Sequence, residues 1–324
     1  MNDSVKTPAY GPSHECVDYI LGITFEIWEQ GNIGFIRDYY SADIEMATID
    51  GLTVGNEAIV EGTAAMLRAF PDRKLLADDV IYGGTGPERF YSSHRIVSPM
   101  TNLGATAFGP ATGRSVRIMT IADCLVENGV ITGEWLVRDN HALVVQLGFD
   151  PIEAARVVRA SRSAENHVWI RRQIEELRAR ESARVHSCVS PALFARRVIG
   201  ALWRGEASSV SADYAPYAVM HRSPIVMASG RESIFAHYDE LASAFRAEAV
   251  SVDHVIVKPT LPHESQMAVR WSVAATHVGP YLGLPATGRS VYLLGVTHWR
   301  LVEGRIAVEW TIFDGLGVLS QLVD

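Results

Sequence analysis

Two aspartates follow a tryptophan at the same distance in two distant parts of the chain. Asp139 comes four residues after Trp135, and Asp314 comes four residues after Trp310. Side chains alternate along a strand, which places each aspartate at the end of an apolar face that carries the tryptophan. Apolar surroundings raise the pKa of a carboxyl group, as acid–base catalysis near neutral pH requires. Each aspartate also directly precedes a predicted helix, so an N-cap is the alternative role.

A histidine on the second hairpin could share this chemistry. His298 precedes Asp314, whereas Asp123 stands at the matching place before Asp139. The alternation puts His298 and Asp314 on opposite faces unless a β-bulge shifts the phase. We take Asp139, Asp314 and His298 as the candidate catalytic residues. The candidates for pocket lining are Trp135, His94, Trp299, Trp310, His277 and Trp271. Packing in the core is the alternative for Trp271 and Trp310, and a packed or surface position is the alternative for the two histidines.

The first hairpin also carries charged side chains. Asn128-Gly129 is typical of a two-residue hairpin turn, and this turn would pair Asp123 with Glu134. Both acids would then share a face with Arg117 and Arg138. We expect a charge network on the outer face of the hairpin.

The two aspartates belong to a sequence repeat. The heptapeptide PATGRSV occurs at 110–116 and again at 285–291, and the separation of its two copies defines the repeat offset. Other matches follow at the same offset, so the pattern predicts a duplicated domain. The predicted boundaries are residues 1–150 for the first copy, 151–186 for a connector and 187–324 for the second copy. The connector is rich in Ala, Glu and Arg and is predicted to be helical.

The order of elements is the same in both copies and indicates the fold class. Each copy begins with a helical stretch, continues with a short extended segment and a second helix, and ends with a run of strands. Helices followed by consecutive strands joined by tight turns are typical of an α+β domain rather than a doubly wound sheet. The PATGRSV segment is predicted to be the turn at the start of the long hairpin strand.

Composition excludes several classes of function. Hydrophobic residues make up 48% of the 324 residues, and the formal net charge is −8. This balance argues against a nucleic-acid partner. We see no signal peptide and no apolar run that could span a membrane, so we expect a cytoplasmic protein without a membrane partner. The three cysteines, Cys16, Cys124 and Cys188, are scattered and predict neither a metal site nor disulfides.

The repeated motif resembles that of the SnoaL-like polyketide cyclases of the NTF2-like superfamily. The motif is a PTG-like turn, a strand, a turn ending in Gly, Glu-Trp, three residues, Asp and a closing Gln-Leu. It reads PATGRSVRIMTIADCLVENGVITGEWLVRDNHALVVQLG in the first copy and PATGRSVYLLGVTHWRLVEGRIAVEWTIFDGLGVLSQLV in the second. The resemblance implies two cone-shaped α+β domains, each with helices packed on a curved, mostly antiparallel sheet.

The resemblance also implies a chemistry. Members of this family catalyse intramolecular aldol cyclisation with an Asp/His pair and with neither cofactor nor metal. We therefore expect a cofactor-independent cyclase, isomerase or hydrolase that acts on a small apolar carbonyl compound, in an intramolecular pseudo-dimer that could also form a homodimer. The superfamily includes binding modules as well. A non-catalytic module for a small hydrophobic ligand, with one degenerate pocket, is the alternative.

Overall fold

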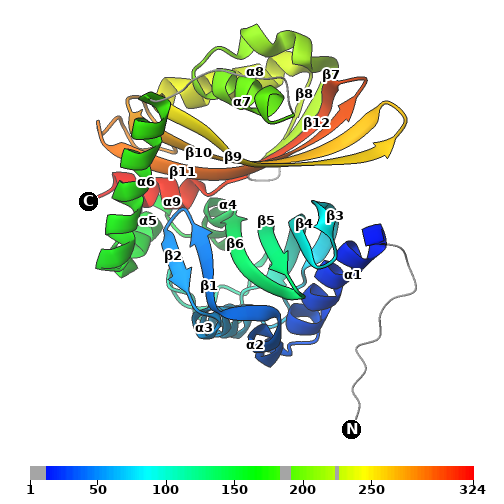
Figure 1. Ribbon diagram of the computed structural model, residues 1–324. Helices are drawn as coiled ribbons and strands as arrows, with labels where there is room; N and C mark the ends of the chain where they lie inside the picture. Colours follow the sequence, from blue (N-terminus) through cyan, green and yellow to red (C-terminus); the bar gives the residue numbers. More distant parts are fainter. Residues whose placement is uncertain (1–11, 183–190, 223–225) are drawn as a thin grey trace.

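A computed structural model of the protein describes residues 12–182, 191–222 and 226–324 (Figure 1). Cys188 and the boundary predicted at residue 186 lie outside these described residues. None of the helices in the described ranges is long and apolar enough to cross a membrane.

The first copy is a six-stranded sheet with helices on one face. Its strand order is β2-β1-β6-β5-β4-β3, with β1 and β6 parallel and the other neighbours antiparallel. Asn128 and Gly129 have φ values of 51° and 76°, as the predicted two-residue turn between β5 and β6 requires. The elements are α1 (Pro12–Thr24), a π-helical turn (Phe25–Glu29), a 3-10 turn (Ile33–Phe35), α2 (Ile36–Tyr39), β1 (Tyr40–Thr48), β2 (Gly51–Val54), α3 (Asn56–Ala69), β3 (Leu76–Gly86), β4 (Arg89–Thr101), β5 (Ser115–Glu127), β6 (Val130–Arg138) and α4 (Asn140–Leu147).

The second copy repeats this architecture strand for strand. Its sheet has the order β8-β7-β12-β11-β10-β9, again with a single parallel pair, β12 and β7. The structure therefore confirms the predicted tandem α+β fold. The elements are α7 (Pro191–Trp203), a 3-10 segment (Ala207–Asp213), β7 (Tyr214–Arg222), β8 (Val226–Ser229), α8 (Arg231–Ala244), β9 (Phe245–Leu261), β10 (Glu264–His277), β11 (Ser290–Val302), β12 (Arg305–Phe313) and α9 (Gly315–Leu322).

Equivalent residues in the first strands of the two sheets are one position closer together in the chain than equivalent residues in the rest of the repeat. Tyr40 in β1 lies opposite Ile131, and Tyr214 in β7 lies opposite Ile306. The two isoleucines are separated by the full repeat offset, whereas the two tyrosines are one position closer together in the chain. Tyr40 and Tyr214 are therefore the equivalent tyrosines of the two copies.

The connector consists of two helices, α5 (Pro151–Ser161) and α6 (Ala164–Ser182). The carboxylate of Asp150 caps α5 by accepting the backbone N–H groups of Ile152 and Glu153, each at 2.9 Å. Helix α6 stands beside both sheets and contacts β2 of the first copy and β9, β10 and β11 of the second (Figure 1).

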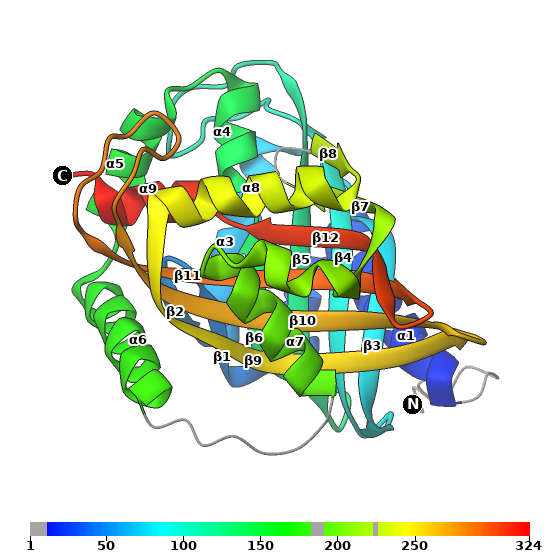
Figure 2. The same cartoon turned by 90° about the horizontal axis from the view of Figure 1, so that it is seen from above.

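The two sheets pack face to face, with α1, α2 and α3 on the outer face of the first sheet and α7 and α8 on the outer face of the second, while α4 and α9 contact each other between the copies. Figure 1 shows the sheets as the central layers, and Figure 2 shows that their strands cross. Each sheet therefore has one face toward its own helices and the other toward the second sheet. This double burial explains why β4 and β10, each one strand in from the sheet edge, are buried along most of their length.

The interface between the sheets has approximate two-fold symmetry in its side chains. The Arg270 guanidinium lies 3.5 Å from the centroid of Trp135, and the Arg95 guanidinium lies 3.9 Å from that of Trp310. Arg270 also forms an ion pair with Asp123, which is almost fully buried. The two arginines are equivalent residues of the repeat, as are the two tryptophans, so the duplicated residues exchange partners across the interface.

The symmetry is broken where the second copy has His298 in place of Asp123. The His298 ring nitrogens contact Ser93 Oγ at 2.8 Å and Arg95 Nη1 at 3.0 Å. Burial, and then the positive charge of Arg95, lower the pKa of His298 well below its usual value. Arg95 instead forms its ion pair with Asp78 at 2.7 Å.

Candidate active site

A β-bulge in each hairpin shifts the phase on which the predicted faces depended. In the first copy the register shifts between Leu125 and Val126, so Asp123 lies opposite Trp135 and Cys124 lies opposite Glu134. The predicted pairing of Asp123 with Glu134 is wrong, because the bulge adds one residue and reverses the faces of the strand.

With this register, the charged side chains that were predicted to share the outer face of the hairpin lie on two different faces. Asp123 and Trp135 face the second sheet, whereas Glu134 and Arg138 face the interior of the first cone. The second copy has the same bulge, between Arg300 and Leu301, and it directs Glu309 into the second cone.

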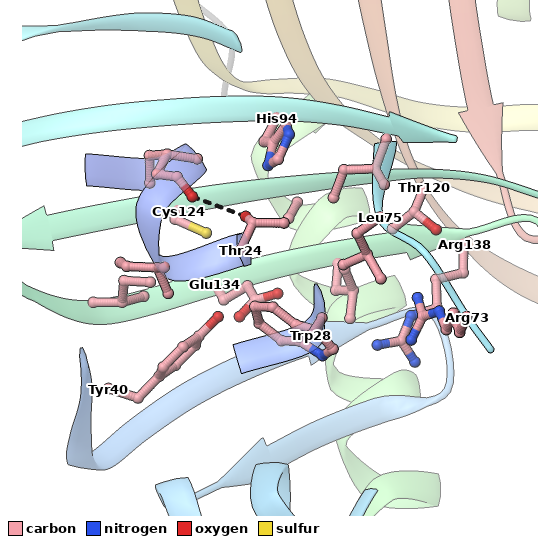
Figure 3. A pocket seen from close by; sticks show the side chains of 16 residues that line it. Thr24, Trp28, Tyr40, Arg73, Leu75, His94, Thr120, Cys124, Glu134 and Arg138 are labelled. Carbon is pink, nitrogen blue, oxygen red and sulfur yellow. Dashed lines mark hydrogen bonds between the residues drawn. The ribbon is translucent and has the colours of Figure 1, made fainter. Parts of the chain in front are cut away.

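The interior of the first cone contains a cavity of about 550 Å³, including its open mouth. The wall is apolar over most of its area and is interrupted by a few polar groups (Figure 3). The lining side chains are Ile20, Ile23, Thr24, Trp28, Tyr40, Arg73, Leu75, His94, Ile96, Thr120, Ala122, Cys124, Ile131, Glu134, Leu136 and Arg138.

Glu134 is the carboxylate of this cavity. Its side chain, at the centre of β6, is only 5% exposed. Burial raises the pKa of Glu134 to about 6, although the positive charge of Arg138 and the phenol of Tyr40 act in the opposite direction. The Tyr40 side chain points toward Glu134 (Figure 3). A carboxyl group with a pKa near 6 can accept and return a proton close to neutral pH.

Two uncharged polar groups from neighbouring strands share the cavity. His94 lies on β4 and Thr120 on β5, and both are almost fully buried. Burial, reinforced by the charge of Arg95, lowers the pKa of His94 to about 4, so the imidazole is neutral at pH 7. His94 Nε2 and Thr120 Oγ1 have no hydrogen-bond partner within the described residues. Both atoms are therefore available to a carbonyl or hydroxyl group in the cavity.

Two arginines lie together at one side of the cavity. Arg73 comes from the loop between α3 and β3 and is 5% exposed, and Arg138 is the last residue of β6 (Figure 3). Burial and the neighbouring charge of Arg138 lower the pKa of Arg73 to about 9. Burial also lowers the pKa of Arg138, against the opposing charge of Glu134. The Nε atoms of both arginines lack a hydrogen-bond partner among the described residues.

The corresponding carboxylate of the second cone is enclosed. Glu309 is fully buried. It accepts hydrogen bonds from the Tyr214 hydroxyl at 2.5 Å, the Tyr238 hydroxyl at 2.6 Å, Trp299 Nε1 at 3.0 Å and Thr311 Oγ1 at 2.8 Å. A carboxylate with four donors has no free lone pair directed at a ligand, so Glu309 holds the core of its domain together.

Large side chains fill the second cone. At the repeat offset, Trp271 replaces Ile96, Trp299 replaces Cys124 and Phe313 replaces Arg138. Trp271 and Trp299 are fully buried, and Trp271 packs against Trp203 with a centroid distance of 5.2 Å. These replacements fill the space around Glu309 that corresponds to the cavity beside Glu134, and the second cone is called filled in this sense. A cavity of about 560 Å³, including its open mouth, remains elsewhere in the second copy, with His237, Leu241, Thr311 and Phe313 among its lining residues. The comparison of the two copies was the sequence signal that could have identified the open cone.

The two predicted catalytic aspartates act as helix N-caps in the structure. Asp139 Oδ1 accepts the N–H of Ala142 at 2.9 Å, and Asp314 Oδ1 accepts the N–H of Leu316 at 3.0 Å. Asp314 lines a separate cavity between the two copies, where its Oδ2 accepts a hydrogen bond from Asn140 at 2.6 Å. Burial, followed by the charge of Asp50, raises the pKa of Asp314 to about 8.

Of the predicted pocket residues, His94 lines the cavity of the first cone. The other candidates lie elsewhere: Trp271 and Trp299 in the filled cone, and Trp135, Trp310 and His298 at the interface between the sheets. His277 holds the second PATGRSV loop, because its Nδ1 accepts the N–H of Thr287 at 3.2 Å. Sequence reasoning missed Glu134, Tyr40, Arg73 and Arg138 as cavity residues. In the part of the chain that the structure describes, no cluster of three or more His, Cys, Asp or Glu is arranged to hold a metal ion.

The molecule is thus a tandem of two α+β cones, one of which holds an acid–base group in an apolar cavity. The family model of the SnoaL-like polyketide cyclases matches residues 20–147 and 193–322. The chain belongs to this family, with one match in each copy.

Several solved structures are similar to this chain over about the length of one copy. AclR from Streptomyces galilaeus is 22% identical, with a TM-score of 0.37, over 42% of this chain and 96% of its own. IdmH from Streptomyces antibioticus is 21% identical, with a TM-score of 0.36, over 43% of this chain and 99% of its own. A SnoaL-like polyketide cyclase from Agrobacterium tumefaciens is 19% identical, with a TM-score of 0.35, over 41% of this chain and 98% of its own. No curated protein matches the chain.

Proposed function

We propose that the protein is a cofactor-independent acid–base catalyst of the polyketide-cyclase type, which cyclises or isomerises a small carbonyl compound in the first cone. Glu134 is the proton-transfer group. The observation that carries the proposal is the position of Glu134 in an apolar cavity, where burial raises its pKa to about 6. Family membership supports this class of chemistry, and the filled second cone serves as a scaffold.

The proposed reaction is an intramolecular aldol addition. The Glu134 carboxylate removes a proton from a carbon next to a carbonyl group, which gives an enolate. The enolate carbon attacks a second carbonyl of the same molecule, and a carbon–carbon bond forms. The resulting alkoxide takes back the proton from Glu134, so that substrate and product have the same formula and no redox partner is required. A base with a pKa near the working pH is suited to both transfers.

The neighbouring polar groups stabilise the charge that develops on oxygen. The neutral imidazole of His94 and the hydroxyl of Thr120 can each donate a hydrogen bond to a carbonyl oxygen as it becomes an enolate. The apolar wall, to which Trp28 and Leu136 contribute, limits the water around the reacting atoms. Intramolecular attack is then favoured because the cavity holds the two carbonyl groups close together.

The test is a comparison of Glu134→Gln with the wild type. A panel of aromatic and polycyclic keto compounds is screened by thermal shift, and turnover is followed for every compound that binds. We expect Glu134→Gln to keep binding, because Gln has almost the same shape, and to lose about 100-fold or more in kcat/KM.

Matched controls separate Glu134 from the other carboxylates. Glu309→Gln changes the equivalent residue of the filled cone, and Asp139→Asn and Asp314→Asn test the predicted catalytic aspartates, with His298→Gln beside them. Full turnover in Glu134→Gln, with loss in either aspartate variant, would transfer the proton-transfer role to that aspartate. Ligand binding without turnover in the wild type would favour a binding module.

We further propose a cytoplasmic location. The three cysteines are scattered along the sequence, which suits a reducing compartment. A homodimer remains a prediction that the molecular mass in solution would test.

A further inference from the structure

The cavity of the first cone contains more positive than negative charge. Its ionisable lining groups at pH 7 are Arg73, Arg138 and Glu134, since His94 is neutral there. Two guanidinium groups therefore face one carboxylate. Buried charges in proteins are normally paired, because an unpaired charge in an apolar environment is costly. The described residues around the cavity leave one guanidinium without a full counter-charge.

The acidic residues near the arginines are engaged elsewhere. Asp72, next to Arg73 in the chain, accepts the N–H of Thr101 at 2.7 Å. Glu29 forms an ion pair with Lys74 at 3.0 Å. Asp314 approaches Arg138 from the cavity between the two copies, but its raised pKa keeps it protonated at pH 7. These three acids therefore do not neutralise the arginine pair.

The fold itself does not require the two arginines. At the repeat offset, Phe313 stands in place of Arg138, and Glu248 stands in place of Arg73. Glu248 lies outside the filled cone and pairs with Arg178 of the connector. The second copy forms the same six-stranded sheet with neither arginine. The arginine pair therefore accompanies the open cavity rather than the architecture.

We propose that Arg73 and Arg138 bind a carboxylate of the substrate, so that the first cone takes a keto acid rather than a neutral ketone or ester. Guanidinium groups bind carboxylates through paired hydrogen bonds, and the free Nε atoms of both arginines supply donors for them. The apolar body of the ligand then lies along Trp28, and its carbonyl group lies beside Glu134 (Figure 3). The position of the carbonyl rests on the proposed function, but carboxylate binding can be measured without turnover.

The experiment is isothermal titration calorimetry at pH 7 with a matched pair of ligands, para-acetylbenzoate and its methyl ester. The variant is Arg73→Met, and the control is Arg68→Met, which removes an arginine of α3 that does not line the cavity. We expect the wild type to bind the acid at least about tenfold more tightly than the ester, because only the acid pairs with the guanidinium groups. Arg73→Met should abolish this preference, and Arg68→Met should keep it.

Thermal unfolding of the ligand-free variants excludes a purely structural explanation. Arg73→Met should melt no lower than the wild type, because it removes an unpaired buried charge and keeps the apolar stem. Equal affinity of the wild type for acid and ester, no binding of the acid, or an unchanged preference in Arg73→Met would overturn the proposal. Tighter binding of para-acetylphenyl phosphate than of the carboxylate would assign the site to phosphate instead.

This outcome is separable from that of the proposed function. Acid preference without turnover of any keto compound would leave the carboxylate site standing and remove the catalytic proposal. Turnover that depends on Glu134 but is equal for acid and ester would support the catalytic proposal and remove the carboxylate site.

Discussion

Glu134 and Glu309 occupy equivalent positions in the two copies, but Glu134 faces a cavity whereas Glu309 is enclosed by four hydrogen-bond donors. The difference comes from the surrounding residues, because both lie on the same strand of the same sheet. Cys124 leaves space beside Glu134, and Trp299 fills that space and donates to Glu309. The two cones thus differ in whether the buried glutamate faces open space or is enclosed by donors.

The pH dependence of activity should follow the ionisation of Glu134. Its carboxylate is the active base and its pKa is about 6, so kcat/KM should rise about tenfold per pH unit below 6 and level off above it. The measurement is kcat/KM from pH 4.5 to 8 with a substrate that does not itself titrate in this range. A rate that falls as the pH rises through 6 would instead make Glu134 a general acid.

Glu134 should also lower the stability of the protein as it ionises. Its pKa in the folded state lies above that of an unfolded chain, so the folded protein binds the proton more tightly. Its contribution to stability is fully present below about pH 4.5 and is lost as the pH rises to about 6. The difference is about 2 kcal/mol. Urea unfolding at pH 4.5 and 7 should show this decline in the wild type, and Glu134→Gln should lack that part of it.

Glu309→Gln should destabilise the protein, whereas Glu134→Gln should not. The amide brings two donors to a place where the hydroxyls of Tyr214 and Tyr238 and the indole of Trp299 already donate. At least one buried donor then loses its acceptor, at a cost of about 3 kcal/mol. Urea unfolding at pH 7 compares this variant with Glu134→Gln, which should be as stable as the wild type or more so. Equal destabilisation of both variants would contradict the assignment of one open and one filled cone.

The repeat and the fold class could be predicted from the sequence, whereas the faces of the hairpin could not. The repeat offset, which is constant except at the first strand of each sheet, is visible because turns such as PATGRSV keep their sequence when their backbone must keep its shape. The bulge opposite Leu125 and Val126 leaves a weaker mark, because Thr132-Gly133 forms it in the first copy and Ala307-Val308 in the second, so that the single glycine is the residue typical of a bulge. One added residue was enough to move Glu134 from the predicted outer face to the cavity and Trp135 to the interface.

Asp139 and Asp314 illustrate a second limit of sequence reasoning. A strand that ends in Asp before a helix predicts both a buried carboxyl group and an N-cap, and the structure contains the N-cap at both positions. Arg73 was hidden for a different reason, because it lies in a loop whose path into the cavity depends on the packing of α3 and β3. Alternation along a strand says nothing about such a residue.

The ion pair between Asp123 and Arg270 should stabilise the packing of the two sheets. Asp123→Asn leaves the guanidinium of Arg270 buried against Trp135 without its counter-charge, which should cost about 3 kcal/mol. His298→Asn, at the equivalent place, should cost less, because Arg95 keeps its ion pair with Asp78. The measurement is the free energy of unfolding in urea. A double variant, Asp123→Asn with Arg270→Met, should recover part of the loss, and no recovery would contradict the charge explanation.

Asp314 should make the protein less stable under alkaline conditions. Burial and Asp50 raise its pKa to about 8, so it is protonated at pH 7, and its contribution to stability is lost as the pH rises through 8. Asp314→Asn keeps an oxygen for the N–H of Leu316 and removes the ionisation. The melting temperature of the wild type should therefore fall more steeply between pH 7 and 9 than that of the variant. Parallel curves would show that Asp314 does not titrate in this range.

A single large side chain should convert the first cone into a copy of the second. Cys124→Trp places an indole where Trp299 stands in the second cone, and its Nε1–H would reach Glu134 as that of Trp299 reaches Glu309. Because overpacking a core usually costs about 1–3 kcal/mol, we expect the variant to fold with a stability within about 3 kcal/mol of the wild type. Ligand stabilisation in thermal shift and turnover should both disappear. Cys124→Ser, which keeps the space open, should retain both. Ligand stabilisation that persists in Cys124→Trp would place the binding site outside the first cone, and the cleft beneath α6, lined by Trp169, Asp253 and Arg270, would be the next place to examine.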